Sequence, residues 1–262
     1  MSNPVIDCLL GHRTVRKFKA KPIEEDKLEL ILRAGTRAAN GGNLQLYSFV
    51  VIDDPAKKKE LAAMWKHSAI NLANAPVIII ALADLSRLRQ WFAIHDSVPA
   101  HTGRAACLFL SIWDSLIALQ NIVVAAESMS MGTCYIGSVL ELDIRKFLNT
   151  PEYVFPAGMV CLGYPEQIPD LSMRLPMDAI VHRNGYQAFT ASQIEKFYKE
   201  RDAVWDRIPE KRKAMLAEQN LFSIAQAVAA QKFSDQVTEE RSRGILDNLH
   251  QAKFDLTGEG NK

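Results

Sequence analysis

The sequence predicts an α+β domain in which helices are layered around a central sheet. Candidate strands and apolar-faced helices follow one another in mixed order, and no internal repeat divides the chain. The 262 residues, of which 48% are hydrophobic, are enough to bury a substantial core. We therefore expect one layered domain built around a sheet.

Three segments have the composition of strands. Tyr47 to Ile52 is rich in aromatic and β-branched residues and is closed by Asp53-Asp54-Pro55. Val77 to Ala83 is an unbroken apolar run, which is typical of a strand covered on both faces. Met159 to Leu162, which ends at Gly163-Tyr164-Pro165, is the third.

Two long segments have the pattern of helices. Pro22 to Ala38 begins with a proline and three acidic residues, and its apolar residues fall on one face: Leu28, Ile31, Leu32 and Gly35. A loop of residues 39–43 follows it. Arg104 to Met129 is apolar on almost every side, so it belongs in a core or in an extensive subunit interface.

The C-terminal part of the chain differs in composition from the rest. Beyond Tyr186 the sequence becomes charged and helical, without enough apolar residues for a core of its own. We expect residues 1–190 to form the core, and residues 191–262 to form a helical arm of the same domain. The arm would pack on the core or on a partner subunit.

Charge and apolar runs exclude several classes of protein. The net charge is only +1, so no overall field favours nucleic acid or an acidic membrane surface. The apolar stretches Ala75 to Ala83 and Ala105 to Ala126 are too short or too interrupted to span a bilayer. Residues 1–7 lack the features of a signal peptide, and we therefore expect a cytoplasmic protein.

The four cysteines are scattered without any C-x-x-C pair, which argues against zinc, an iron–sulfur cluster and a disulfide framework. No metal site is predicted. We interpret the cysteines as reduced and mostly buried thiols. Cys134 could also be a reactive thiol near a ligand, although burial in the core is the simpler interpretation.

The most informative segment is a basic cluster near the N-terminus, Gly11-His12-Arg13-Thr14-Val15-Arg16-Lys17-Phe18. Two arginines offer forked, charge-assisted donors, and Thr14 adds a hydroxyl and a backbone N–H. This set is suited to a phosphate, which predicts a phosphorylated cofactor. A solvated patch of charge near a chain end is the alternative.

Two glycine-containing segments could contact a ligand closely. Asn40-Gly41-Gly42-Asn43-Leu44-Gln45 combines backbone freedom with amides that could read the edge of a heteroaromatic ring. In Gly132-Thr133-Cys134-Tyr135-Ile136-Gly137-Ser138, Gly132 could cap the preceding helix and the Gly137-Ser138 pair permits close approach of backbone N–H groups. Neither segment requires a ligand. The first is explained equally by a turn between a helix and a strand, and the second by a helix cap followed by a short strand and a turn.

Several enzyme signatures are absent from the sequence. It contains no G-x-G-x-x-G, G-x-x-x-x-G-K-[ST], H-E-x-x-H or G-x-S-x-G motif. Dinucleotide-fold dehydrogenases, P-loop enzymes, zincins and α/β-hydrolases are therefore not supported. No protein nucleophile presents itself.

Taken together and in order, the segments resemble the nitroreductase family of FMN-dependent oxidoreductases. The matching motifs are His12-Arg13-Thr14-x-Arg16-x-Phe18, Gly42-Asn43-Leu44-Gln45, Gly132 to Gly137, Leu162 to Pro165 and Arg174-Leu175-Pro176. Two tail segments, Phe197 to Arg201 with Trp205 and Ser242 to His250, resemble the NADPH-preferring branch that has a long C-terminal arm. The resemblance covers nearly the whole chain.

The resemblance implies a nitroreductase-like fold with a mainly antiparallel sheet flanked by helices, in an intertwined homodimer. Each of two interface sites would bind one FMN. The residues that it implies as contacts of the phosphate and part of the ring are His12, Arg13, Thr14, Arg16 and Arg174. The residues that would lie along the isoalloxazine are Tyr135, Ile136, Gly137 and Ser138. The residues that would approach the flavin from the partner subunit are Asn40, Gly41 and Asn43.

The implied activity is ping-pong hydride transfer from NADPH or NADH through N5 of FMN to nitroaromatics, quinones or flavins. The chemistry would take place on FMN rather than on a catalytic side chain. Relatives with an arm often carry a lysine where this chain has Ser172, which implies weaker retention of FMN. The choice between NADH and NADPH stays open, with Arg201 and Arg207 as candidate contacts.

Other functions are compatible with the same residues. A flavin-binding carrier or sensor would lack steady turnover, and the same fold supports ene-reduction, dehalogenation and flavin fragmentation. An interaction protein that binds an anionic partner through the basic cluster belongs to a third class. The electron acceptor is not indicated by the sequence.

Overall fold

The computed structural model describes residues 3–64, 72–97 and 102–257. The chain divides into two compact units, Met1–Asp170 with Ser242–Lys262, and Leu171–Arg241. The C-terminal residues from Ser242 therefore pack with the first unit. The boundary between core and arm at residue 190 stays a prediction.

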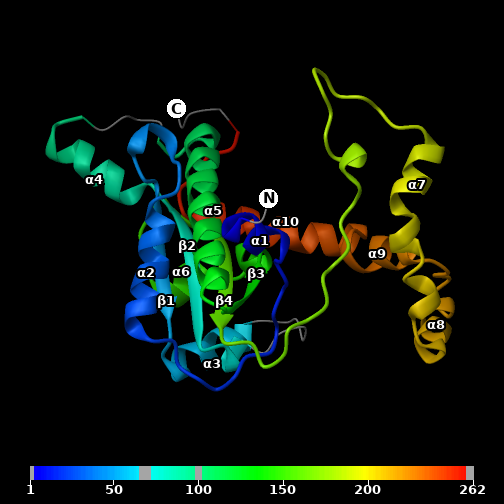
Figure 1. The fold of residues 1–262 in the computed structure, drawn as a ribbon. Helices are drawn as coiled ribbons and strands as arrows, with labels where there is room; N and C mark the ends of the chain where they lie inside the picture. Colours follow the sequence, from blue (N-terminus) through cyan, green and yellow to red (C-terminus); the bar gives the residue numbers. More distant parts are fainter. Residues whose placement is uncertain (1–2, 65–71, 98–101, 258–262) are drawn as a thin grey trace. The chain divides into compact units, whose positions relative to one another are not determined.

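The first unit is built on a four-stranded antiparallel sheet (Figure 1). The strands lie in the order β1-β2-β4-β3. Their bounds are Tyr47–Ile52 for β1, Val77–Asp84 for β2, Gly132–Ile136 for β3 and Val154–Gly163 for β4. The predicted α+β class with an antiparallel sheet is confirmed, and so are the three predicted strands.

Strand β4 is longer than predicted and fully buried. Its first half contains Pro156 and Gly158, two residue types that disfavour strands. Pro156 is tolerated because it lies beyond the stretch that pairs with β3, and the register with β2 shifts between Ala81 and Leu82. This local irregularity explains why the sequence pattern identifies only the second half.

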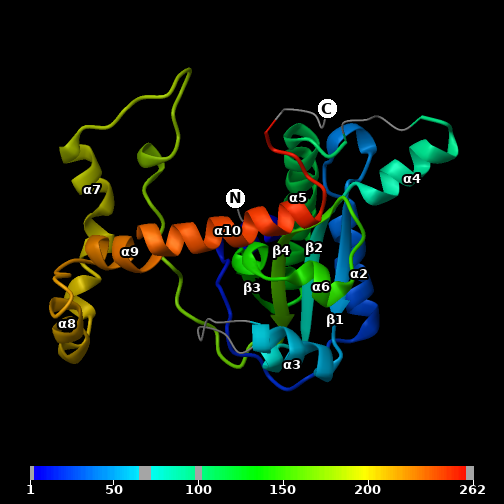
Figure 2. The same ribbon diagram turned by 180° about the vertical axis from the view of Figure 1, so that it is seen from behind.

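Helices cover both faces of the sheet, as Figures 1 and 2 show from opposite sides. On one face, α2 (Glu25–Thr36) and α5 (Ala105–Ser128) pack against residues such as Ile79 and Val160. On the other, α3 (Pro55–Met64), α6 (Ile144–Leu148) and the short η3 (Ser138–Glu141) enclose residues such as Ile80. The predicted burial of Val77 to Ala83 on both faces is confirmed.

Both predicted helices of this unit form, with small differences at their ends. α2 begins three residues after Pro22, with Glu24 as its N-cap, and buries Leu28, Ile31 and Gly35. α5 departs from its predicted bounds by one residue at each end. The predicted cap at Gly132 is wrong: α5 is capped by Met129, Ser130 takes the positive φ of 63°, and Gly132 begins β3.

Among the helices in the described ranges, α5 alone is long enough and apolar enough to cross a membrane, judged by length and composition. This differs from the expectation that polar residues interrupt the stretch too often. The core helix of a soluble protein passes the same test. Ser111, Asp114 and Ser115 of α5 are buried, and Ser115 Oγ donates to the carbonyl of Leu82 in β2 at 3.1 Å. This face of α5 therefore packs on the sheet.

Four further helices lie outside the predicted segments: α1 (Pro4–Leu10), α3, α4 (Ser86–Ile94) and α6. α1 is capped by the side chain of Asn3 and buries none of its residues. Short 3-10 helices occur at Gly41–Asn43 (η1) and Leu72–Asn74 (η2). The end of α10 (Asp235–Gln251) joins this unit, where Asn248 Nδ2 donates to the carbonyls of Leu140 and Leu142.

The second unit is helical, as predicted for the charged part of the chain. It contains α7 (Ala191–Asp202), α8 (Glu210–Ala217), α9 (Ile224–Lys232) and the 3-10 turns Met177–Ala179 (η4) and Trp205–Arg207 (η5). A capping box between Thr190 and Gln193 fixes the start of α7. Each helix buries only one residue: Phe197, Leu216 and Ala227.

A polar cluster ties the start of α2 to the end of β4 and gives the first testable prediction. Tyr164 Oη donates to Glu24 Oε2 at 2.5 Å and accepts from Lys27 Nζ at 3.0 Å. The Tyr164 hydrogen bond is the main cause that lowers the pKa of Glu24 to about 2. Because this pKa lies below the ordinary value, the contribution to stability is complete above about pH 4.3 and is lost as the pH falls toward 2.

We expect Tyr164→Phe to raise the pKa of Glu24 toward its ordinary value, because the strongest donor to the carboxylate is removed. A carbon-13 NMR titration of the Glu24 carboxyl group measures the change. Tyr186→Phe, at an exposed tyrosine of the second unit, is the matched control. An unchanged titration in the Tyr164 variant would show that the lysines alone hold the carboxylate ionised.

Candidate functional site

The predicted basic cluster lies along the outer edge of the sheet. Thr14 forms a parallel bridge with Thr133 of β3, and the Val15 N–H donates to the Thr133 carbonyl at 2.8 Å. A Cβ on Gly132 would lie 2.6 Å from Val15 Cβ, so glycine is required for the segment to approach β3 this closely. The segment of residues 12–16 is thereby fixed to the edge strand.

His12 is oriented by a carboxylate that no motif in the sequence links to it. Its Nδ1 lies 2.8 Å from Oε1 of Glu127, near the end of α5. A carboxylate oxygen only accepts, so Nδ1 carries the hydrogen and Nε2 is left for another partner. The same oxygen accepts from Thr133 Oγ1 at 2.5 Å, and Thr133 is fully buried. Glu127 therefore joins α5, β3 and the basic segment.

We expect Glu127→Ala to lower the free energy of unfolding by about 2 kcal/mol, because it leaves the buried Thr133 hydroxyl and His12 Nδ1 without their acceptor. Urea denaturation measures the loss. Glu127→Gln, which keeps an acceptor oxygen, is expected to retain more than half of that stability. Equal losses in the two variants would assign the effect to the charge rather than to the acceptor.

The two arginines of the cluster have different surroundings. Arg13 Nη1 donates to the Gly11 carbonyl at 2.7 Å, and its buried Nε has no partner in the described part of the chain. Arg13 lines a cavity of about 420 Å³ together with Val15 and Gly132. Arg16 is exposed, and its charge acts on Cys134. Among the described residues, the two guanidinium groups share no common partner.

Cys134 is a buried residue of the core, as the simpler interpretation predicts. Burial is the larger effect and raises the pKa of its thiol, and the positive charge of Arg16 acts in the opposite direction. Cys161 is also buried, whereas Cys8 and Cys107 are half-buried, and all four cysteines are free. A buried thiol with a raised pKa is a poor nucleophile.

The segment Tyr135 to Ser138 leaves the same edge of the sheet. Tyr135 is exposed at the end of β3, and the side chain of Ile136 is buried in the core, so only its backbone is free to meet a ligand. A Cβ on Gly137 would meet no atom within 4 Å, which leaves open space beside the backbone. Because Thr14 pairs in parallel with Thr133, Arg16 and Tyr135 lie at a similar height along the edge.

The loop that follows α2 is held by its own amides and by α5. Asn40 Oδ1 accepts from the Gln45 N–H at 3.1 Å, and the Gly41 N–H donates to Oδ1 of Asp114 at 3.0 Å. Asp114 is only 2% exposed, and its Oδ2 has no partner among the described residues. Gly42 and Asn43 take positive φ angles of 58° and 55°, which glycine and asparagine accept most readily.

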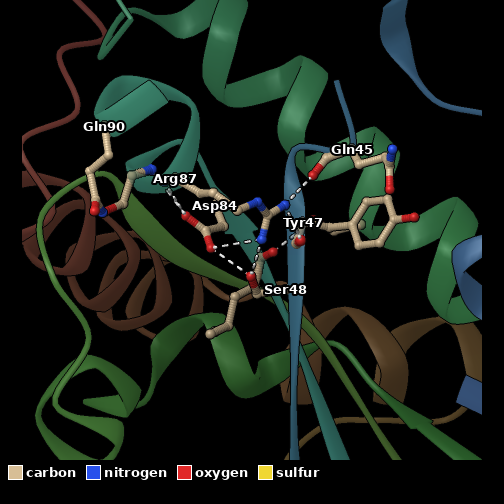
Figure 3. Close-up of polar contacts among 9 residues, drawn as sticks. Gln45, Tyr47, Ser48, Asp84, Arg87 and Gln90 are labelled. Atoms are coloured by element: carbon tan, nitrogen blue, oxygen red, sulfur yellow. Dashed lines mark hydrogen bonds and ion pairs between the residues drawn. The ribbon is translucent and has the colours of Figure 1, made fainter. Parts of the chain in front are cut away.

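A second polar cluster anchors the far end of this loop (Figure 3). Arg87 Nη2 donates to the carbonyls of Gln45 at 2.6 Å and Tyr47 at 3.1 Å. Ser48 Oγ donates to Asp84 Oδ2 at 2.5 Å, and Arg87 Nη1 lies 3.8 Å from the same oxygen. No local motif marks these residues in the sequence. Asp84 is the acidic last residue of the otherwise apolar strand β2, and this is the one signal that the sequence offers for the cluster.

One chain does not bring all the predicted residues together. The loop of residues 40–43 contacts Asp114, whereas His12 contacts Glu127, 13 residues further along α5. At about 1.5 Å per residue these two positions lie about 20 Å apart. Arg174 belongs to the second unit, where its guanidinium donates to the Ser172 and Met173 carbonyls at 3.2 and 3.1 Å.

Comparison with known proteins shows to which family this chain belongs. The model of the nitroreductase family matches residues 9–164, which include the edge segment, the loop after α2 and all four strands. The chain belongs to the nitroreductase family. This assignment confirms the resemblance that the sequence motifs indicate.

Individual relatives of this nitroreductase-family chain are reductases. An NADPH-flavin oxidoreductase from Vibrio harveyi is 32% identical over 74% of this chain and 80% of the relative. An oxygen-insensitive NADPH nitroreductase from Salmonella typhimurium is 31% identical over the same shares. A crystal structure of NADPH:FMN oxidoreductase from Vibrio harveyi with NAD⁺ is 27% identical, covering 93% of this chain and 98% of that one with a TM-score of 0.72.

Proposed function

We propose that this nitroreductase-family chain is an FMN-dependent NAD(P)H oxidoreductase that reduces nitroaromatics, quinones or flavins. The observation that carries the proposal is the row of donors on the edge of β3. The backbone of Thr14 pairs there with Thr133, close in the chain to Tyr135 and Gly137, and Arg16 follows on the same segment. The chain is related to NADPH-dependent flavin reductases and nitroreductases. No protein nucleophile is needed for such a reaction.

The residues on this edge fit FMN by their chemistry. Arg16 is exposed and forms no hydrogen bond or ion pair among the described residues, so its guanidinium group is available for a phosphate. The open space beside Gly137 lets a flat ring approach the backbone, where an added Cβ would intrude. His12, Arg13, Tyr135, Ile136 and Ser138 belong to the same proposed site.

When bound, FMN supplies the redox chemistry by accepting a hydride from a reduced nicotinamide and delivering it to an acceptor. The chain supplies binding, orientation and charge. Arg16 and Thr14 would hold the phosphate end, Glu127 fixes the hydrogen of His12 on Nδ1, and the positive charge of Arg16 favours negative charge on a nearby ligand. Arg174 is proposed as a second phosphate contact.

We also propose that the active form is a homodimer in which Asn40, Gly41 and Asn43 complete the site of the partner subunit. The separation of about 20 Å along α5 keeps them from His12 of their own chain. The outer faces of α1 and α5 are apolar and exposed, with Leu10 at 74% and Trp113 at 60%. Such a surface is typical of an extensive subunit interface.

An absorbance spectrum and an anaerobic titration test the proposed function. We expect a yellow protein with one FMN per protomer, bleached by NADPH or NADH and reoxidised by a nitroaromatic or quinone. Bleaching without reoxidation by any acceptor would favour a carrier or sensor instead. Sedimentation of the FMN-loaded protein tests the dimer, and a monomer with full activity would contradict the shared site. A cytoplasmic location stays a prediction from the sequence.

A further inference from the structure

A cavity of about 600 Å³ lies at the end of the sheet where β2 begins, between the segment that enters α2 and helix α3. Its apolar wall includes Phe18, Ile23, Leu28, Pro76 and Val77. None of the predicted FMN-binding residues lines it. The proposed function therefore leaves this cavity without a role.

One wall residue is a buried lysine. Lys58 of α3 is only 8% exposed, and it lines the cavity. Its ammonium group donates to the carbonyls of Ala75 at 2.9 Å and Pro76 at 3.1 Å. An ammonium group has three N–H donors, so one is left over after these contacts.

This buried charge has no counter-ion in the described part of the chain. Among the described residues, Lys58 forms no ion pair with a carboxylate, whereas its exposed neighbour Lys57 pairs with Glu60 at 2.8 Å. Carbonyl dipoles stabilise a buried cation only in part, and an anion would complete its surroundings. The cavity gives such an anion access to Lys58.

The remaining polar residues restrict the charge of the ligand. Glu25 and Asp53 both line the cavity and are exposed, and they would repel a second negative charge. Lys21 also lines the cavity, but its charge is paired with Glu24 at 3.0 Å. A nucleotide or a polyphosphate is therefore disfavoured. A single carboxylate on an apolar body satisfies both Lys58 and the apolar wall.

We propose that this cavity is a second ligand site, distinct from the flavin site, which binds an aromatic monocarboxylate with Lys58 as the anchor of the carboxylate. The probe is naphthalene-2-carboxylate, titrated calorimetrically into the FMN-saturated protein. Because the flavin site is filled, and because flavin absorbance reports any ligand that stacks there, the two locations are distinguished in one sample.

We expect one probe per protomer to bind without a change in the flavin spectrum. Lys58→Met, which keeps an unbranched stem, should weaken binding about 10- to 100-fold because a charge-assisted hydrogen bond is lost. Lys59→Met, at an exposed lysine of the same helix, is the matched control and should bind normally. The neutral naphthalene-2-carboxamide should bind the wild type about as weakly as the carboxylate binds Lys58→Met.

A second variant keeps the proposal testable if Lys58→Met does not fold. Ala20→Trp places an indole on the exposed part of the cavity wall, leaves Lys58 in place and should abolish binding. Equal affinity in wild type, Lys58→Met and Ala20→Trp would overturn the proposal. So would binding that perturbs the flavin spectrum and persists in Ala20→Trp, because it would place the probe at the flavin.

Discussion

Replacement of Arg16 by alanine is expected to weaken FMN binding by about 10- to 100-fold, because a charge-assisted contact to a phosphate contributes about 1.5–3 kcal/mol. The guanidinium group is exposed and forms no hydrogen bond or ion pair within the described ranges, so the fold should be unaffected. Fluorescence quenching of free FMN by the apoprotein measures the dissociation constant. A urea denaturation curve of the same sample measures stability.

Lys17→Ala is the matched control for this experiment. Lys17 is the next residue and is also exposed, and its backbone carbonyl accepts from the Glu166 N–H in either variant. Removing its charge tests whether the overall positive charge of the segment matters. An equal loss of FMN affinity in both variants would reduce the basic cluster to a diffuse electrostatic patch.

Replacement of Asp114 by alanine is expected to lower the free energy of unfolding by about 2–3 kcal/mol. The substitution removes the acceptor of the Gly41 N–H from the middle of the helix that covers the sheet. The loop of residues 40–43 then loses its attachment to α5, and FMN affinity should fall with it if this loop serves the partner's site. Urea denaturation and the FMN titration measure the two effects.

Asp114→Asn separates the hydrogen bond from the charge. The amide oxygen still accepts from Gly41, so we expect stability within about 1 kcal/mol of the wild type. Burial, and to a lesser extent the charge of Asp114, raise the pKa of the Tyr47 phenol. The asparagine variant should therefore lower the pKa of Tyr47 in an ultraviolet titration. A loop equally disordered in both variants would contradict the role of the acceptor.

Much of the sheet could be predicted because the local composition of its strands is typical of β-structure. Val77 to Ala83 is a continuous apolar run, and the structure buries it on both faces. The first half of β4 is not predicted, because a proline such as Pro156 disfavours a strand in a sequence pattern. The structure accepts Pro156 because β3 does not pair with this half of β4, and that pairing cannot be read from the local sequence. Gly132 was misassigned as a cap because its need for glycine comes from Val15, more than a hundred residues earlier.

In the candidate site, too, residues within one motif could be predicted from the sequence, whereas residues that act on distant partners could not. The basic segment of residues 12–16 is visible as a motif, and the structure brings it to the edge of β3. Glu127 and Asp114 act on partners 115 and 73 residues away, and no local pattern links them. In the sequence Asp114 was only an interruption of an apolar helix. Its role emerges once the loop after α2 is folded against it.

The pairing of Thr14 and Val15 with Thr133 also bears on solubility. β3 is an outer strand, and an uncovered outer strand is a template on which another molecule can add by main-chain hydrogen bonding. The N-terminal segment occupies part of that template. Shortening the chain past Phe18 would thus do more than remove cofactor contacts: it would expose a strand on which aggregation could nucleate.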